Sequence, residues 1–123
     1  MPNPTQIVVV DDDPSISLAL KRLLTAAGFD ATTFGSAEAL LQAGVTTDVD
    51  CLILDVHLPG LSGFELRRRL VNVGAATPVI FITAHDEPAV RAQAEQAGAV
   101  AYLVKPFPGR GLLAAVNRAV RPP

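Results

Sequence analysis

Cysteine is nearly absent from this chain of 123 residues. Its single cysteine, Cys51, excludes an internal disulfide and a zinc site built from several cysteines. Because Cys51 stands in an apolar run, it is expected to be a small residue of the hydrophobic core. A lone thiol of this kind fits a protein of the reducing cytoplasm.

Basic charge and long apolar runs are also scarce. The formal net charge is −2 and the isoelectric point is near 5.5. No basic field therefore attracts a phosphate backbone, and direct binding of nucleic acid is not expected. The N-terminal stretch MPNPTQIVVV has no basic start, and its apolar run is too short for a signal sequence or a membrane span. The composition predicts a soluble, cytoplasmic protein that does not bind membranes.

Half of the residues are hydrophobic, which suits one compact domain with a sizeable core. We expect a single domain over residues 1–123, with its core at about 6–120. Five short segments rich in β-branched or apolar residues lie at 7–10, 31–34, 51–54, 79–83 and 100–104. Four of them are continuous apolar runs, typical of strands buried on both faces of a parallel sheet. The segment ATTF at 31–34 is more polar and suits an edge strand.

Helical patterns separate these segments. In the first pattern, apolar residues from Ile16 to Ala27 form one stripe, and a later helix is expected to turn Leu66, Leu70 and Val73 inward. Strict alternation of strands and helices implies right-handed crossovers with helices on both faces of the sheet. The sequence therefore predicts a doubly wound α/β domain with a five-stranded parallel sheet and five helices.

Polar residues stand where the predicted strands end. In doubly wound sheets the ligand lies outside the carboxyl ends of the strands, and the residues at those ends are Asp11, Asp12, Asp13, Asp55, Thr83 and Lys105. Two carboxylates about 4 Å apart repel by roughly 4 kcal/mol at a surface-like dielectric. A divalent cation such as Mg²⁺, which prefers oxygen ligands, removes that penalty. A carboxylate beside it can attack phosphorus, while the hydroxyl and the ammonium bind phosphoryl oxygens.

Four motifs give these residues a family resemblance: VVDDD, LILDVHLPGLSG, FITAH and YLVKPF. Together they resemble the receiver domain of bacterial two-component response regulators, over about residues 7–120. The resemblance implies a flavodoxin-like fold with strand order 2-1-3-4-5. It also implies that Asp55 is phosphorylated and that Mg²⁺ or Mn²⁺ is bound by Asp11, Asp12, Asp55 and the backbone carbonyl of His57. Asp13 is expected to cap or begin the first helix instead.

The same resemblance implies a switch. Thr83 and Lys105 would bind the phosphoryl group, Lys105–Pro106 would be a cis peptide bond, and Tyr102 would turn inward after phosphorylation. The face formed by the fourth helix, the fifth strand and the fifth helix would then change its affinity for an output partner or form a homodimer. The implied phosphodonor is a sensor histidine kinase or a phosphotransfer protein. Such a domain assists its own phosphorylation and hydrolysis and turns over no independent substrate.

Two further expectations concern the surroundings of the site. His57 and His85 flank the path of attacking water in the family, so either they tune the lifetime of the phosphoryl group or they are ordinary exposed loop residues. The stretch from Thr83 to Phe107 resembles receivers that carry a C-terminal helix-turn-helix domain, which implies a transcriptional output. The final RPP is where a proline-rich linker begins in longer regulators, so the chain is either a stand-alone receiver or a piece of a larger protein.

Three other functions are compatible with parts of the sequence. A haloacid-dehalogenase-type phosphatase would use Asp11, Asp13 and Ser15, but it needs an acid pair beyond the lysine, and residues 107–123 contain no Asp or Glu. A flavodoxin-like cofactor binder would need a Gly- and Ser-rich loop after the first strand, where carboxylates stand instead. A receiver that is never phosphorylated and serves only as an interaction module is the third alternative.

Overall fold

The structure is a computed structural model that describes residues 4–44 and 48–120. Within these residues, five strands alternate with five helices, as predicted: β1 (Gln6–Val10), α1 (Pro14–Ala26), β2 (Asp30–Phe34), α2 (Ala37–Ala43), β3 (Cys51–Asp55), α3 (Gly63–Asn72), β4 (Val79–Thr83), α4 (Pro88–Gln96), β5 (Ala101–Val104) and α5 (Gly109–Val120). All strand pairs are parallel, and the strand order is β2-β1-β3-β4-β5. The predicted doubly wound α/β fold and its strand order are confirmed.

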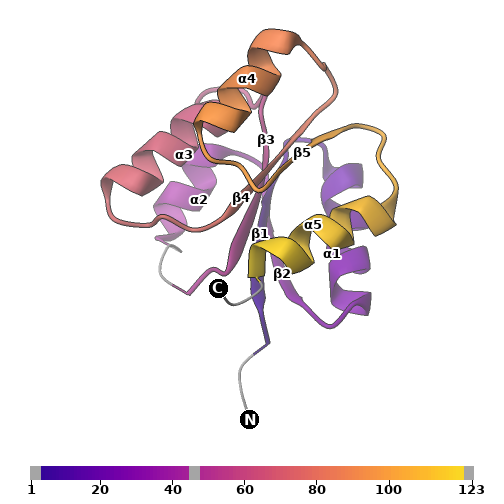
Figure 1. Cartoon of the computed structure of the whole chain (residues 1–123). Coiled ribbons are helices and arrows are strands. Elements are labelled where there is room, and N and C mark those ends of the chain that lie inside the picture. The colour runs from indigo at the N-terminus through magenta and orange to yellow at the C-terminus, as the bar shows by residue number, and fades with distance from the viewer. Residues whose placement is uncertain (1–3, 45–47, 121–123) are drawn as a thin grey trace.

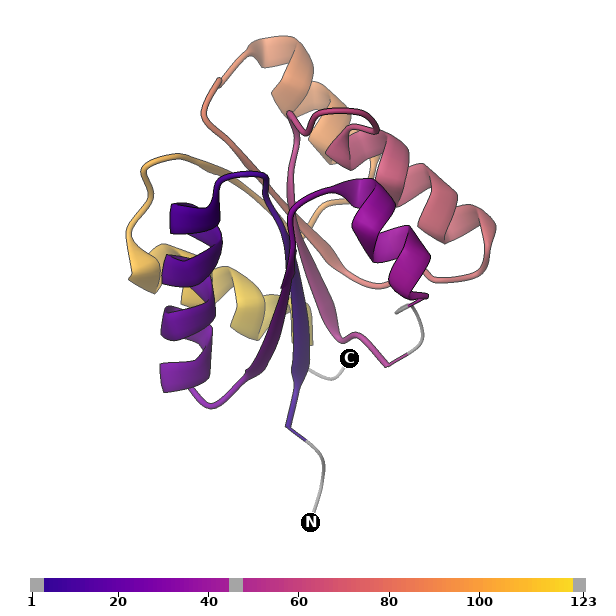
Figure 2. The same cartoon turned by 180° about the vertical axis from the view of Figure 1, so that it is seen from behind.

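The helices form two layers around the sheet. Helices α1 and α5 cover one face, and α2, α3 and α4 cover the other, which is visible from both sides of the molecule (Figures 1 and 2). Successive residues of the central strands point to opposite faces. In β1, Val8 and Val10 therefore pack with the layer of α2, α3 and α4, whereas Ile7 and Val9 pack with α1 and α5. Burial on both faces explains why the central strands read as continuous apolar runs.

Local signals in the sequence fix where the helices begin. The side chain of Asp13 accepts hydrogen bonds from the backbone N–H groups of Ser15 and Ile16, so this third acid caps α1, as expected. A capping box begins α3: the Ser62 hydroxyl accepts from the Glu65 N–H, and the Glu65 carboxylate accepts from the Ser62 N–H. These caps position the loops that carry the polar residues at the strand ends.

Two expectations about burial are wrong. Val73 is 73% exposed rather than turned inward, because α3 ends at Asn72 and Val73 is its C-cap. The fifth strand is half-buried rather than buried on both faces, because it pairs only with β4 at the edge of the described sheet. The prediction that β2 is an edge strand is confirmed. The ends of the expected domain, including the final RPP, lie outside the described residues.

Cys51 is fully buried in the core between the sheet and helices α1 and α5, as expected. Burial raises the pKa of its thiol to about 12, so the group stays neutral in the folded protein. Across the described ranges 4–44 and 48–120, none of the helices has the length and apolar character needed to traverse a lipid bilayer.

Gly63 packs directly against the strand that ends in Asp55. Its N–H donates to the carbonyl of Val56 at 3.1 Å, and a Cβ at this position would overlap the carbonyl oxygen of Asp55. Gly63→Ala is therefore expected to lower the free energy of unfolding by about 1–3 kcal/mol, measured by urea denaturation. Gly35→Ala is the matched control, because open space surrounds Gly35. Equal stability of the two variants would contradict the close packing of α3 on β3.

Candidate functional site

The parallel register brings the ends of three strands together. Val10 of β1 lies beside Leu54 of β3, so the residues that follow them, Asp11 and Asp55, are neighbours. Strand β4 ends in the fully buried Thr83, next to the end of β3. Both acids are almost completely buried, with Asp11 1% and Asp55 5% exposed, whereas Asp12 is exposed. Burial of two carboxylates so close together requires a compensating positive charge.

Lys105 supplies that charge. Its Nζ lies 2.8 Å from Oδ2 of Asp11 and 2.9 Å from Oδ2 of Asp55, so the ammonium joins two carboxylates that are far apart in the sequence. The other oxygens accept backbone hydrogen bonds: Oδ1 of Asp11 from the Asp13 N–H at 2.9 Å, and Oδ1 of Asp55 from the His57 N–H at 3.0 Å. Each buried carboxylate is therefore bonded through both of its oxygens, which fixes its orientation.

Burial and neighbouring charges shift the pKa values of Asp55 and Lys105. Burial raises the pKa of Asp55 above its ordinary value, hydrogen bonds from Lys105 and His57 offset part of this change, and repulsion from Asp11 adds to it. Burial alone would lower the pKa of Lys105, but its hydrogen bonds to Asp11 and Asp55 outweigh burial and raise it. Lys105 therefore remains a cation, able to stabilise negative charge that develops on a group bound at Asp55.

The acids fit a divalent metal by their donor chemistry and convergence. Asp11, Asp12 and Asp55 can each offer one carboxylate oxygen, and these three oxygens lie within 4.8 Å of one another. Mg²⁺ prefers hard oxygen ligands. It takes only a few of them from the protein, and water or phosphoryl oxygens complete its shell. The loop after β3 places His57 two residues beyond Asp55, and its N–H bond to Asp55 holds the backbone there.

Thr83 is engaged with the loop that follows it and with His57. Its Oγ1 accepts a hydrogen bond from the His85 N–H at 3.0 Å, and it lies 3.2 Å from the His85 carbonyl and 3.3 Å from Nδ1 of His57. The rings of His57 and His85 meet edge to face, with centroids 5.6 Å apart, and both residues are exposed. The two histidines thus stand beside Thr83 at the rim of the site.

The remaining predicted residues lie on β5 and just beyond it. Tyr102 is half-buried, and its hydroxyl donates to Oδ1 of Asp86 at 3.2 Å, so it is bonded to the loop that follows β4. The Lys105–Pro106 peptide bond is cis in the structure. The predicted site residues therefore lie at the carboxyl edge of the sheet or, for Tyr102, within its edge strand β5.

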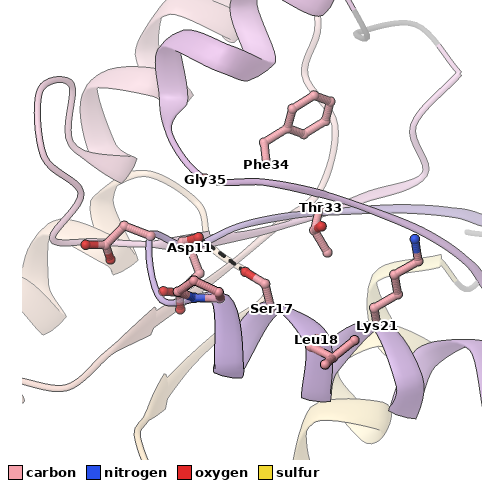
Figure 3. Close-up of a pocket in the computed structure, with 9 residues that line it drawn as sticks. Asp11, Ser17, Leu18, Lys21, Thr33, Phe34 and Gly35 are labelled. Atoms are coloured by element: carbon pink, nitrogen blue, oxygen red, sulfur yellow. Dashed lines mark hydrogen bonds between the residues drawn. The ribbon is translucent and has the colours of Figure 1, made fainter.

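A cavity of about 380 Å³ adjoins the acids between α1 and the end of β2 (Figure 3). Ser17 lies on its wall and donates from its hydroxyl to the carbonyl of Asp11 at 3.2 Å. Ser17 is buried, and the sequence reasoning missed it. Its spacing of three and seven residues from Leu20 and Leu24 places it on the inward stripe of α1, which is the signal that could have found it.

The family model of the response regulator receiver domain matches residues 7–117. The chain therefore belongs to the response regulator receiver domain family, and the resemblance drawn from the four motifs is confirmed. Receiver domains are signalling domains of two-component systems rather than classical enzymes, and the family in general uses Mg²⁺. This membership sets aside the phosphatase and flavin-binding alternatives.

Alignments with individual relatives cover almost the whole chain. Nodulation protein W of Bradyrhizobium diazoefficiens is 40% identical over 113 residues, which are 92% of this chain and 50% of that protein. Transcriptional regulatory protein FixJ of Azorhizobium caulinodans is 38% identical over 120 residues, or 98% of this chain and 57% of that protein. The crystal structure of a response regulator receiver protein from Burkholderia phymatum has 45% identity and a TM-score of 0.82, with 94% of each chain covered. The chain thus spans about half the length of the curated relatives named here.

Proposed function

We propose that this receiver domain accepts a phosphoryl group on Asp55 from the phosphohistidine of a sensor kinase or phosphotransfer protein in the cytoplasm. Mg²⁺ or Mn²⁺, held by Asp11, Asp12, Asp55 and the His57 carbonyl, is its cofactor. The observation that carries the proposal is the contact of Lys105 Nζ with both Asp11 and Asp55 beside the exposed Asp12. An interaction module without chemistry has no need to bury two carboxylates and a lysine together.

A carboxylate oxygen of Asp55 attacks phosphorus and forms the O–P bond, while the N–P bond of the phosphohistidine breaks and its electron pair stays on the imidazole nitrogen. Lys105 and the Thr83 hydroxyl donate hydrogen bonds to phosphoryl oxygens as charge develops on them. The metal, when bound, neutralises charge on the transferring group. Attack of water on phosphorus later breaks the O–P bond, leaves the electron pair on the Asp55 carboxylate and releases inorganic phosphate.

The phosphorylated state is the signal. Capture of the Thr83 hydroxyl by the phosphoryl group would draw it away from the backbone of His85, and Tyr102 would turn into the space released. The face formed by α4, β5 and α5 would then control an output domain or partner, or pair with a second copy. Five of the relatives that match this chain are named as transcriptional regulators or transcriptional regulatory proteins, which supports a transcriptional output. We propose one receiver domain over residues 1–123.

Mg²⁺ binding tests the metal part of the proposal. The parent protein is expected to gain thermal stability on addition of Mg²⁺, because the ion relieves repulsion among the carboxylates of the folded state. Asp12→Asn removes a proposed metal ligand and is expected to weaken the apparent Mg²⁺ affinity by at least about tenfold. Loss of a residue that only hydrogen-bonds to a metal ligand already weakens metal binding by about that factor. Differential scanning fluorimetry against Mg²⁺ concentration measures both.

Asp48→Asn is the control for this titration, since Asp48 is exposed and is not among the clustered acids. It should respond to Mg²⁺ as the parent does. A parent protein that does not respond, together with unchanged behaviour of Asp12→Asn, would favour the interaction module over the phosphoacceptor.

The two histidines carry a prediction about the lifetime of the phosphoryl group. Both stand at the rim of the site beside Thr83, where water must approach. His57→Ala and His85→Ala are each expected to change the half-life of the phosphorylated protein by about 2- to 10-fold, which is less than the roughly 10²- to 10⁴-fold contributed by a group that transfers the proton itself. The decay is followed by intact-mass spectrometry after removal of phosphodonor. Unchanged half-lives in both variants would make them ordinary exposed loop residues.

A further inference from the structure

Two charged side chains hold Tyr102 at the molecular surface. The Tyr102 hydroxyl donates to Oδ1 of Asp86 at 3.2 Å, and Oδ2 of Asp86 pairs with Nη2 of Arg91 at 3.0 Å. The guanidinium carbon of Arg91 lies 4.7 Å from the centre of the Tyr102 ring, which is a cation–π contact. These three contacts close a ring among the loop after β4, helix α4 and strand β5.

This ring of contacts is connected to Thr83 through the backbone of His85, the residue that precedes Asp86. Thr83 Oγ1 accepts from the N–H of His85 and lies within hydrogen-bond distance of its carbonyl, and Asp86 is the next residue along the chain. Movement of the Thr83 hydroxyl toward a group on Asp55 would break its bonds to His85. The backbone that carries the Asp86 side chain would then be free to shift, and the contacts around Tyr102 would be loosened.

We infer that Asp86 and Arg91 form a clamp that holds Tyr102 against the loop after β4 and helix α4 and thereby opposes the switch until Asp55 is phosphorylated. The inference rests on the proposed function and adds two positioning residues to it, neither of which belongs to the four sequence motifs. Arg91 and Tyr102 also line a groove of about 210 Å³ between α4 and β5. Release of the clamp therefore reshapes the face proposed to contact the output partner.

The clamp is expected to bias the switch moderately. The side chains of Arg91 and Asp86 are 50% and 42% exposed, and exposed ion pairs are weak individually. Because a ligand that selects the switched state binds in proportion to the population of that state, loss of even a weak restraint is visible as tighter binding. We expect Asp86→Ala to lower the concentration of beryllofluoride that half-saturates the protein by about 2- to 10-fold.

Tyr102 itself supplies the signal for this titration. The chain has one tyrosine and no tryptophan, so tyrosine emission reports the surroundings of Tyr102 alone. The experiment titrates beryllofluoride in the presence of Mg²⁺ and follows this emission in the parent, Asp86→Ala, Arg91→Ala and Glu87→Ala. Glu87→Ala is the matched control, because Glu87 is the adjacent acid and its side chain makes no capping hydrogen bond. It removes the same charge without removing the clamp.

The outcomes of this titration distinguish failure of the clamp from failure of the proposed function on which it rests. Tighter half-saturation in Asp86→Ala and Arg91→Ala, with Glu87→Ala equal to the parent, supports the clamp. Identical curves in all four proteins overturn it while leaving the proposed function intact. A parent that does not respond to beryllofluoride overturns the proposed function, and the regulatory role of the clamp with it.

A spectrophotometric titration without Mg²⁺ tests the contact directly. Burial raises the pKa of Tyr102 above its ordinary value, and the hydrogen bond to Asp86 raises it further because the neighbouring carboxylate disfavours the phenolate. Arg91 and the backbone N–H of Glu87 act in the opposite direction, and Glu95 also lines the groove. Asp86→Ala should therefore ionise Tyr102 at lower pH than the parent. An unchanged or higher pKa would mean that Asp86 does not hold the hydroxyl, and the clamp would be rejected.

Discussion

Asp55→Asn is expected to abolish covalent phosphorylation of the chain. With acetyl phosphate and Mg²⁺, the parent should gain the mass of one phosphoryl group, whereas the variant should keep its original mass. The physical reason is the loss of the nucleophile: an amide oxygen cannot form a stable acyl phosphate, even though Asn occupies nearly the same volume. Asp11 and Asp55 both lie against the Lys105 ammonium and in the acid cluster, but Asp55 ends β3, the strand that pairs with β4 and therefore lies next to Thr83.

Asp13→Asn is the matched control for this experiment. Asp13 is two residues from Asp11, but its side chain caps α1 rather than joining the acid cluster, and Asn is an equally good capping residue. The variant should be phosphorylated to the same extent as the parent. If Asp55→Asn were still phosphorylated, or if Asp13→Asn were no longer phosphorylated, Asp55 would not be the nucleophile.

Lys105→Met is expected to have the second largest effect. Methionine keeps much of the apolar length of lysine but leaves Asp11 and Asp55 facing each other without a cation. Loss of one hydrogen-bond donor to a developing charge typically slows a reaction about 10²- to 10³-fold, and we expect the rate of phosphorylation by acetyl phosphate to fall by that amount. The rate is measured from the time course of the intact mass.

The same substitution should also lower stability. Removing one member of a buried ion pair costs about 3–5 kcal/mol when it is fully buried. The Lys105 side chain remains 14% exposed, so we expect the metal-free variant to lose about 2 kcal/mol. Mg²⁺ should restore part of this loss by replacing the missing positive charge.

Lys21→Met is the control for stability, because Lys21 is the only other lysine of the chain and is exposed on α1. Its unfolding free energy should match that of the parent in urea denaturation. If Lys105→Met were as stable as the parent without metal, the ammonium would not be needed to hold the buried acids together.

The architecture and the position of the site could be predicted because they depend on local patterns. Apolar runs predicted the strands. Because ligands lie at the carboxyl ends of parallel strands, the residues that follow these strands were predicted to share one edge of the sheet: Asp11, Asp55, Thr83 and Lys105. The role of Asp13 was also predictable, because an acid immediately before an apolar helical stripe is a typical N-cap.

What could not be predicted depends on contacts between side chains from different elements. Periodicity placed Val73 on the inner face of α3, but it cannot tell that the helix ends one residue earlier. Nothing local in the sequence pairs Asp86 and Arg91 with Tyr102, because these contacts join α4 to β5 through the tertiary fold. The contact of Lys105 with both buried acids likewise appears only once β1, β3, β4 and β5 are assembled in the sheet.

Identification of the modified residue is the decisive test of Asp55 as the phosphoacceptor. The protein is incubated with acetyl phosphate and Mg²⁺, trapped with borohydride, which reduces an acyl phosphate to an alcohol, and digested for peptide sequencing by mass spectrometry. Homoserine at position 55, dependent on both phosphodonor and Mg²⁺, is the expected result. An unmodified Asp55 in protein that still binds Mg²⁺, or homoserine at Asp11 or Asp12 in its place, would contradict the assignment of Asp55 as the phosphoacceptor.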